Sequence, residues 1–193
     1  MATVDEPGGT GIRGMAERAN PAFAAGAVAV PIVALAVALA TGNTRYLFYV
    51  HVMAGALWTG VDVFMGAVLG PVLGGLDVEE RASVFERFTP KMTFLMPVLA
   101  AVTITAGVEL ATVLKGGLGA FWIQVALGVA VLLSIVGFGV ILPGEVAIYR
   151  ELVSGNPDKD RISDIGMRNA KLGGVQGVLQ LGIIFVMMQL RFL

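Results

Sequence analysis

Cysteine is absent from the 193 residues of this chain, and histidine occurs only once, at position 51. Without cysteine there can be no disulfide, zinc–thiolate site, iron–sulfur cluster or thiol nucleophile. A single histidine excludes multi-histidine metal sites and a bis-histidine haem within one chain. With no nucleophile elbow either, a hydrolase triad has nothing to be built from. Metal chemistry would therefore use His51 with carboxylates or thioethers.

Charge is also scarce. Charged residues make up 14% of the chain and hydrophobic residues 56%, whereas a soluble domain usually carries about 25% charged residues. The mean hydropathy is +0.84. A net charge of −1 offers no basic surface for nucleic acid, so a nucleic-acid-binding module is excluded. The composition is that of an integral membrane protein.

Apolar segments long enough to cross a hydrocarbon core of about 30 Å recur five times. They predict an all-α bundle of five transmembrane helices in one domain, residues 20–193, after a flexible cytoplasmic arm at 1–19. The segment 77–88 carries apolar residues at helical spacing and predicts a short helix lying at the interface. The predicted spans are approximately 21–41, 46–73, 91–115, 118–150 and 171–191.

The basic residues predict the orientation, because Lys and Arg are enriched in cytoplasmic loops. Ten lie in the arm, the loop after the second span and the loop after the fourth, and three lie on the other side. We therefore expect the N-terminus inside the cell and the C-terminus outside, in the cytoplasmic membrane. The lipid bilayer is then one partner, and a homo-oligomer or a larger membrane complex is another candidate.

Four ionisable residues fall inside the spans, where each costs about 2.5–3.5 kcal/mol at a helix centre. Their depths place His51 level with Glu109 in the outer half, near Met53, which suggests a metal or haem site. Asp62 is near mid-membrane. Glu145 is close to the inner interface, where we expect it to pair with Arg150.

Asp62 shares one helical face with His51, Gly55 and Trp58, because they are separated by four, three and four residues. His51 and Asp62 are about 16 Å apart along the helix axis, too far to share a metal ion. Thr103 and Gln180 could meet Asp62 from neighbouring spans. Trp58, Asp62, Thr103 and Gln180 thus form a candidate intramembrane polar or proton path.

Small residues inside the spans predict close helix packing, and Gly66 and Gly70 form a small-xxx-small pair. Gly55 belongs to the same set of packing glycines. The intramembrane polar groups also have a purely structural interpretation. His51 and Asp62 could simply be hydrogen-bonded within the bundle, and the methionines could fill gaps in an apolar core.

The second and third spans resemble the CopD-like family of bacterial and archaeal membrane proteins over residues 46–115. The matching features are a histidine, a Trp-x-Gly motif, a proline that ends the helix, an Arg-Phe pair before the next span, and a pair of small residues near the end of that span. Here they are His51, Trp58, Gly60, Pro71, Arg87, Phe88 and Ala106-Gly107. The resemblance implies copper handling or uptake.

A more distant resemblance is to HemJ-type membrane proteins, in which the corresponding histidine is a haem ligand. This chain lacks their Pro-Arg-Leu and Tyr-His continuation. Three functions therefore stay open: metal or copper handling around His51, a haem b redox protein, and a non-catalytic subunit or ion-conducting protein using Asp62 and Glu109. The candidate cofactors are haem b and copper, because one histidine supports a five-coordinate or His/Met haem and copper accepts His with Met.

Overall fold

A computed structural model of the chain describes residues 11–192, with side chains described up to residue 190. The described part is helical, with short turns between the helices. Five helices are long and apolar enough to cross a membrane, as predicted. The elements are α1 Gly11–Ala19, α2 Pro21–Thr41, α3 Thr44–Phe64, η1 Met65–Leu69, α4 Gly70–Gly74, α5 Val78–Lys115, α6 Phe121–Val136, η2 Gly137–Ile141, α7 Leu142–Leu152 and α8 Lys159–Phe192.

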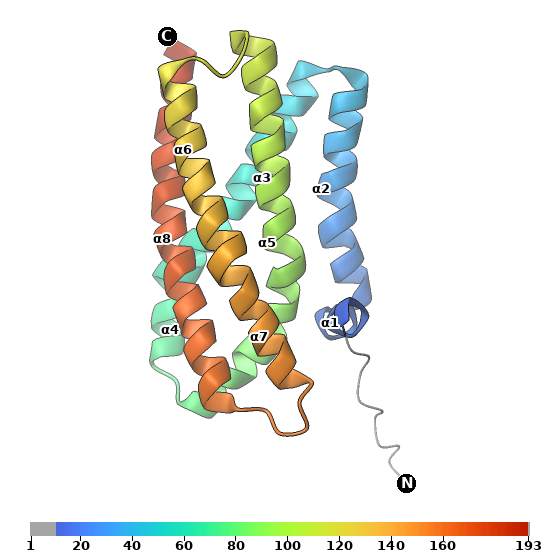
Figure 1. Ribbon diagram of the computed structural model, residues 1–193, viewed down its shortest axis with the longest axis vertical. Coiled ribbons are helices and arrows are strands. Elements are labelled where there is room, and N and C mark those ends of the chain that lie inside the picture. Colours follow the sequence, from blue (N-terminus) through green and yellow to red (C-terminus); the bar gives the residue numbers. More distant parts are fainter. Residues whose placement is uncertain (1–10, 193) are drawn as a thin grey trace.

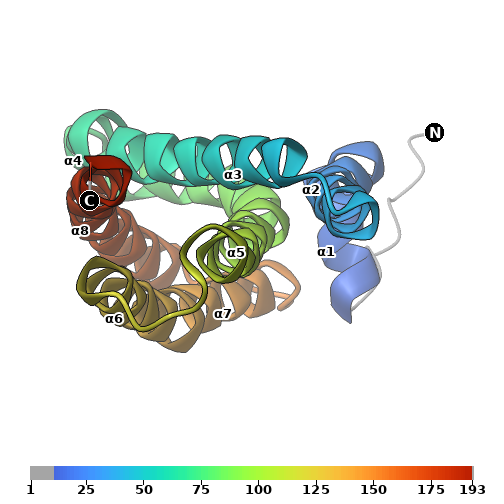
Figure 2. The same ribbon diagram turned by 90° about the horizontal axis from the view of Figure 1, so that it is seen from above.

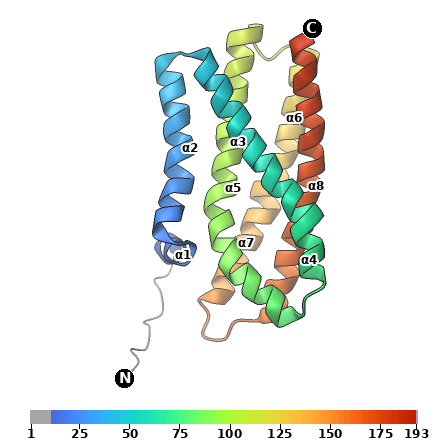
Figure 3. The same ribbon diagram turned by 180° about the vertical axis from the view of Figure 1, so that it is seen from behind.

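The long helices form an upright bundle, with α1 lying across one end (Figure 1). We call this end the α1 end; the α4–α5 and α7–α8 connections also lie there. The C-terminus and the α2–α3 turn are at the opposite, C-terminal end. Viewed along the bundle, α5 lies between α2 and the pair α6–α8 (Figure 2). Helix α3 is strongly tilted, running from α2 at the C-terminal end to α8 at the α1 end (Figure 3).

Helix boundaries follow local capping signals. The Asp77 side chain accepts from the backbone N–H of Glu80, and the Glu80 side chain accepts from that of Asp77, which is a capping box. Asn43 caps α3 in a similar way. At the other end of α5, Gly116 is left-handed, with φ 72°. These signals explain why α3 and α5 begin and end where they do.

Three predicted boundaries differ from the structure. The segment 77–88 is not a separate interfacial helix, because α5 continues unbroken from Val78 through Pro90. The last span likewise belongs to a helix that begins at Lys159. Residues 11–19 of the predicted flexible arm form helix α1, with Met15 and Ala19 buried; residues 1–10 lie outside the described part. In each case a helix continues into a segment that is more polar than the apolar span.

The closest helix crossing joins η1 to α8. A Cβ placed on Gly66 would lie 2.3 Å from the Cα of Gly174, so the two backbones are in direct contact. Gly177 is similarly close to the backbone of Val63. Gly55 lies against the methyl group of Thr103 on α5, whereas a Cβ on Gly70 would meet only the Met65 carbonyl of its own chain segment. The close approach therefore uses Gly66 but not Gly70.

The α1 end is tied together by Arg18, whose guanidinium donates to the carbonyl of Leu152 at 3.1 Å. Because Leu152 is the last residue of α7, this bond satisfies a carbonyl that has no donor within the helix. Glu151 forms an ion pair with Arg161 at 2.9 Å in the same region. These contacts fix α7, and hence the residues it carries, relative to α1 and α8.

Candidate functional site

Two separate places on the tilted helix α3 gather the polar groups of the bundle. One is a cavity of about 80 Å³ lined by α3, η1, α5, α6, η2, α7 and α8. The other is the contact between His51 and α5, nearer the C-terminal end. Both lie on the face of α3 that the residue spacing indicated, since Trp58 and Asp62 line the cavity.

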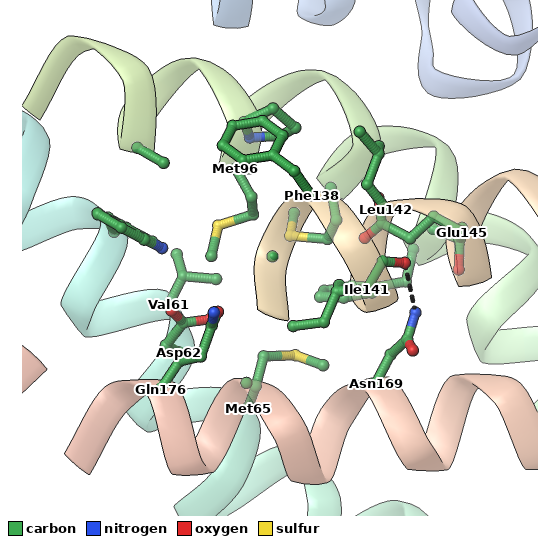
Figure 4. Close-up of a pocket in the computed structure, with 18 of the residues that line it drawn as sticks. Val61, Asp62, Met65, Met96, Phe138, Ile141, Leu142, Glu145, Asn169 and Gln176 are labelled. Atoms are coloured by element: carbon green, nitrogen blue, oxygen red, sulfur yellow. Dashed lines mark hydrogen bonds between the residues drawn. The ribbon is translucent and has the colours of Figure 1, made fainter. Parts of the chain in front are cut away.

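Asp62 lies at one end of the cavity and is 3% exposed (Figure 4). Its Oδ2 accepts a hydrogen bond of 2.9 Å from Nε2 of Gln180 on α8. The indole of Trp58, one turn earlier on α3, also interacts with this carboxyl. The other amide atom, Oε1 of Gln180, is buried and has no partner within the described residues. Asp62 is thus bonded to Gln180, the partner that its depth in the membrane predicted.

Glu145 lies on α7 and is 8% exposed. It lines the same cavity, and its carboxyl is hydrogen-bonded to Thr93 of α5, which is not one of the lining residues. The expected pairing with Arg150 is wrong: Arg150 is exposed, and the described residues contain no ion pair between the two. The cause is a π-helical turn, η2, just before α7, which rotates Glu145 into the bundle.

Helix irregularities surround the cavity. Both η1 and η2 are π-helical, and Pro97 of α5 lines the cavity as well. Two amide side chains of α8 bond to carbonyls before η2 and at its last residue. Gln176 donates to Leu133 at 2.8 Å, and Asn169 donates to Ile141 at 3.0 Å. Short π-helical segments are frequent at functional sites, so this pattern marks the cavity as a candidate site.

The remaining lining of the cavity is largely apolar. Met65 and Met96 point into it from opposite sides, and Phe138 and Ile141 lie between α6–α7 and α5 (Figure 4). Flexible thioether side chains commonly fill irregular gaps of this kind. The polar groups of the cavity are therefore few: the two carboxyls, and the side chains of Thr89, Ser134, Asn169 and Gln176.

His51 is held by α5 on two sides. Its Nδ1 lies 2.8 Å from the carbonyl oxygen of Thr103. A Cβ on Gly107 would lie 2.8 Å from its Cε1, so the ring rests directly on that glycine. Because a carbonyl oxygen only accepts, Nδ1 must carry the proton and Nε2 presents its lone pair. Nε2 has no hydrogen-bond partner in the described chain, and the side chain is only half-buried.

The residues predicted to join His51 do not surround it. Met53 is 41% exposed and points out of the bundle. Glu109 lies beside the α2–α3 turn, lining a small hollow with Gly42 and Thr44. Thr103 contacts His51 through its carbonyl, while its hydroxyl donates to Leu99 rather than to Asp62. The sequence therefore did not reveal the direction of these side chains around the helices, and it placed Thr103 beside Asp62 rather than beside His51.

Metal-ligating side chains are not clustered in the described residues. These contain no group of three or more His, Asp or Glu side chains placed to hold a metal ion. His51 thus stands apart from other such side chains, with one ring nitrogen bonded to Thr103. Comparison of the chain with models of protein families, with curated proteins and with solved structures found no match. The CopD-like and HemJ-like resemblances accordingly stay predictions from residues 46–115.

Proposed function

We propose that this multi-pass membrane protein binds haem b through Nε2 of His51 and serves in electron transfer or porphyrin oxidation. The observation that supports this is the hydrogen bond from His51 Nδ1 to the Thr103 carbonyl. Metal-ligating histidines usually donate their second ring nitrogen to such an acceptor, which fixes the tautomer and the direction of the free lone pair. His51 would therefore hold the iron of a bound haem through its free Nε2.

The choice between haem and a bare metal ion follows from the number of donors. A copper ion held by the protein alone would need further ligands, and neither Met53 nor Glu109 lies beside His51. Haem brings four porphyrin nitrogens and needs one histidine from the chain in a five-coordinate state. A single oriented imidazole therefore favours haem over copper. Copper handling, which the CopD-like resemblance implies, stays a prediction for which His51 would need donors from another molecule.

The distribution of basic residues supports the orientation proposed with this function. The ten Lys and Arg residues of the predicted inner side belong to α1 and the segments that meet at the α1 end. By the positive-inside rule, the α1 end faces the cytoplasm. The haem ligand would then lie in the outer half of the membrane, on the side away from the cytoplasm.

An absorption spectrum of the detergent-purified protein tests the proposal. We expect a Soret band in the wild type that is lost in His51→Ala and kept in Met53→Leu, the matched control from the same turn of α3. Both variants should elute as the same monodisperse species as the wild type. A wild-type protein without a Soret band after expression with ample haem, or a band that survives in His51→Ala, would refute it.

A further inference from the structure

The cavity contains two buried carboxyl groups that a haem on His51 would not use. Asp62 is 3% exposed and Glu145 is 8% exposed, and they come from different helices, α3 and α7. Intramembrane carboxyls are costly, and they commonly mark ion or proton pathways. Here both carboxyls line the same cavity.

The distance between the carboxyls can be estimated along α8, which packs against both. Asp62 lies beside Gly173 and is bonded to Gln180, while Gly144, next to Glu145, lies beside Asn169. The midpoint of the Asp62 contacts is near Gly177, eight residues beyond Asn169. At 1.5 Å per residue these contact points on α8 are about 12 Å apart along the helix axis. Direct proton transfer across that distance is impossible, so a carrier is needed between them.

The cavity has room for such a carrier. A water molecule needs about 10–15 Å³ of cavity volume, so 80 Å³ holds about five or more. A chain of hydrogen-bonded waters with about 2.8 Å per step would cover 12 Å with three or four molecules. The hydroxyl of Ser134 and the amide oxygen of Gln176 line the same space and could bond these waters.

The amide of Gln180 supplies an independent observation. Gln180 is 4% exposed, its Nε2 donates to Asp62, and its Oε1 is buried without a partner in the described chain. An unsatisfied buried oxygen costs about 1–3 kcal/mol, so a donor beside it is strongly favoured. A water at the Asp62 end of the cavity, or the O–H of a protonated Asp62, would provide that donor.

We propose that Glu145, a short water chain and Asp62 form a proton half-channel that opens towards the α1 end. A proton taken up from bulk water neutralises Glu145, passes along the waters and neutralises Asp62, which leaves Glu145 ionised again. No other titratable side chain lines the cavity in the described structure. Near Glu145, the charged neighbour from α8 is Arg168, which is exposed and reaches Gly144, so this end borders the aqueous boundary.

The path ends at Asp62 because the bundle closes beyond it. Trp58, the next residue on the same face, is 7% exposed. One turn further, Gly55 packs on Thr103, and His51 then rests on Gly107. The half-channel thus exchanges protons with one side of the membrane, and it is separate from the His51 site.

Infrared spectroscopy of the protein reconstituted in lipid vesicles tests this inference directly. On transfer from H₂O to D₂O, a protonated carboxyl shows a shift of its C=O stretching band as it exchanges. We expect an exchanging band that is absent in Asp62→Asn. In Glu145→Gln its exchange should be about 100-fold slower, the lower end of what a positioned proton-transfer group contributes. Glu109→Gln, which changes a carboxyl outside the cavity, should leave the rate unchanged.

A second variant guards against a purely structural effect of Glu145→Gln. Ser134→Leu fills the cavity and touches neither carboxyl, so it should also slow the exchange of Asp62. Equal rates in wild type, Glu145→Gln and Ser134→Leu would overturn the proposal, as would an Asp62 carboxyl that is never protonated or never exchanges. The same series in the His51→Ala background needs no haem, so its result is independent of the proposed haem function.

Discussion

Helix α3 carries two polar residues on one face, His51 and Asp62, and they lie in different surroundings. At His51, α3 packs a side-chain ring on a glycine of α5, and one ring nitrogen stays free. At Asp62, the chain packs backbone to backbone on α8, and the carboxyl is buried with an amide partner. The first arrangement presents a group outwards; the second encloses a group inside a cavity.

The difference shows how a membrane bundle makes a polar residue useful. An imidazole with one nitrogen hydrogen-bonded has a fixed orientation. A metal then needs access only to its second nitrogen. A buried carboxyl needs hydrogen-bond donors, which Gln180 of α8 and Trp58 of α3 supply to Asp62. The two sites should therefore respond independently to substitution, and the following changes test that independence.

The largest effect is expected at the α3–α8 crossing. Gly66→Ala would place a Cβ 2.3 Å from the Cα of Gly174, and a backbone cannot yield as a side chain does. We expect the free energy of unfolding to fall by about 3 kcal/mol, the upper end for overpacking. Unfolding by SDS in mixed micelles, followed by circular dichroism, measures it. Gly60→Ala is the control, because no atom lies within 4 Å of its Cβ; equal stability of the two variants would contradict the crossing.

Gly107→Ala should affect the His51 site alone. The added Cβ would meet Cε1 of His51 at 2.8 Å and push the ring away from the Thr103 carbonyl. Because the ring can move, we expect a loss of about 1–2 kcal/mol in stability. Haem content should drop severalfold, whereas proton exchange at Asp62 should not change. A full haem complement in this variant would show that the ring's position is not what orients the ligand.

Gln180→Leu should weaken the Asp62 site. It removes the donor to the carboxyl and, at the same time, the unpartnered Oε1, so the net cost should be about 1 kcal/mol. A double-mutant cycle with Asp62→Asn, using the same SDS titration, isolates the contact between the two side chains. A coupling energy of zero would mean that the 2.9 Å hydrogen bond contributes nothing to stability.

Met53→Leu should change little. The side chain is exposed to lipid and lies away from His51, so we expect a stability change below about 0.5 kcal/mol. Haem content and carboxyl exchange should both equal those of the wild type. A loss of haem in this variant would instead place Met53 at the metal, as the sequence first suggested.

Much of this organisation follows from hydropathy and depth. The five spans, the pairing of Asp62 with Gln180 and the close packing of Gly66 could all be predicted, because each depends on position along the membrane normal. Hydropathy did not predict that the helix at 77–88 continues unbroken into the membrane span, nor that residues 11–19 form a helix, in which Met15 and Ala19 are buried.

The partners of His51 depend on rotation about the helix axis, which depth does not specify. Glu109 is two residues beyond Gly107, and a step of two residues turns a side chain by more than half a helical turn. The actual partner is a backbone carbonyl, which no residue type reveals. Glu145 was misplaced for a related reason: the π-helical turn at Gly137–Ile141 shifts the register of the residues that follow it in the helix.

The ratio of haem to protein in the purified chain tests the central claim most directly. Wild type and Asp62→Asn should each hold about one haem per chain, and His51→Ala should hold none. That result would establish His51 as the ligand and separate it from the cavity. Haem retained in His51→Ala, or lost equally in Asp62→Asn, would contradict the division of α3 into two independent sites.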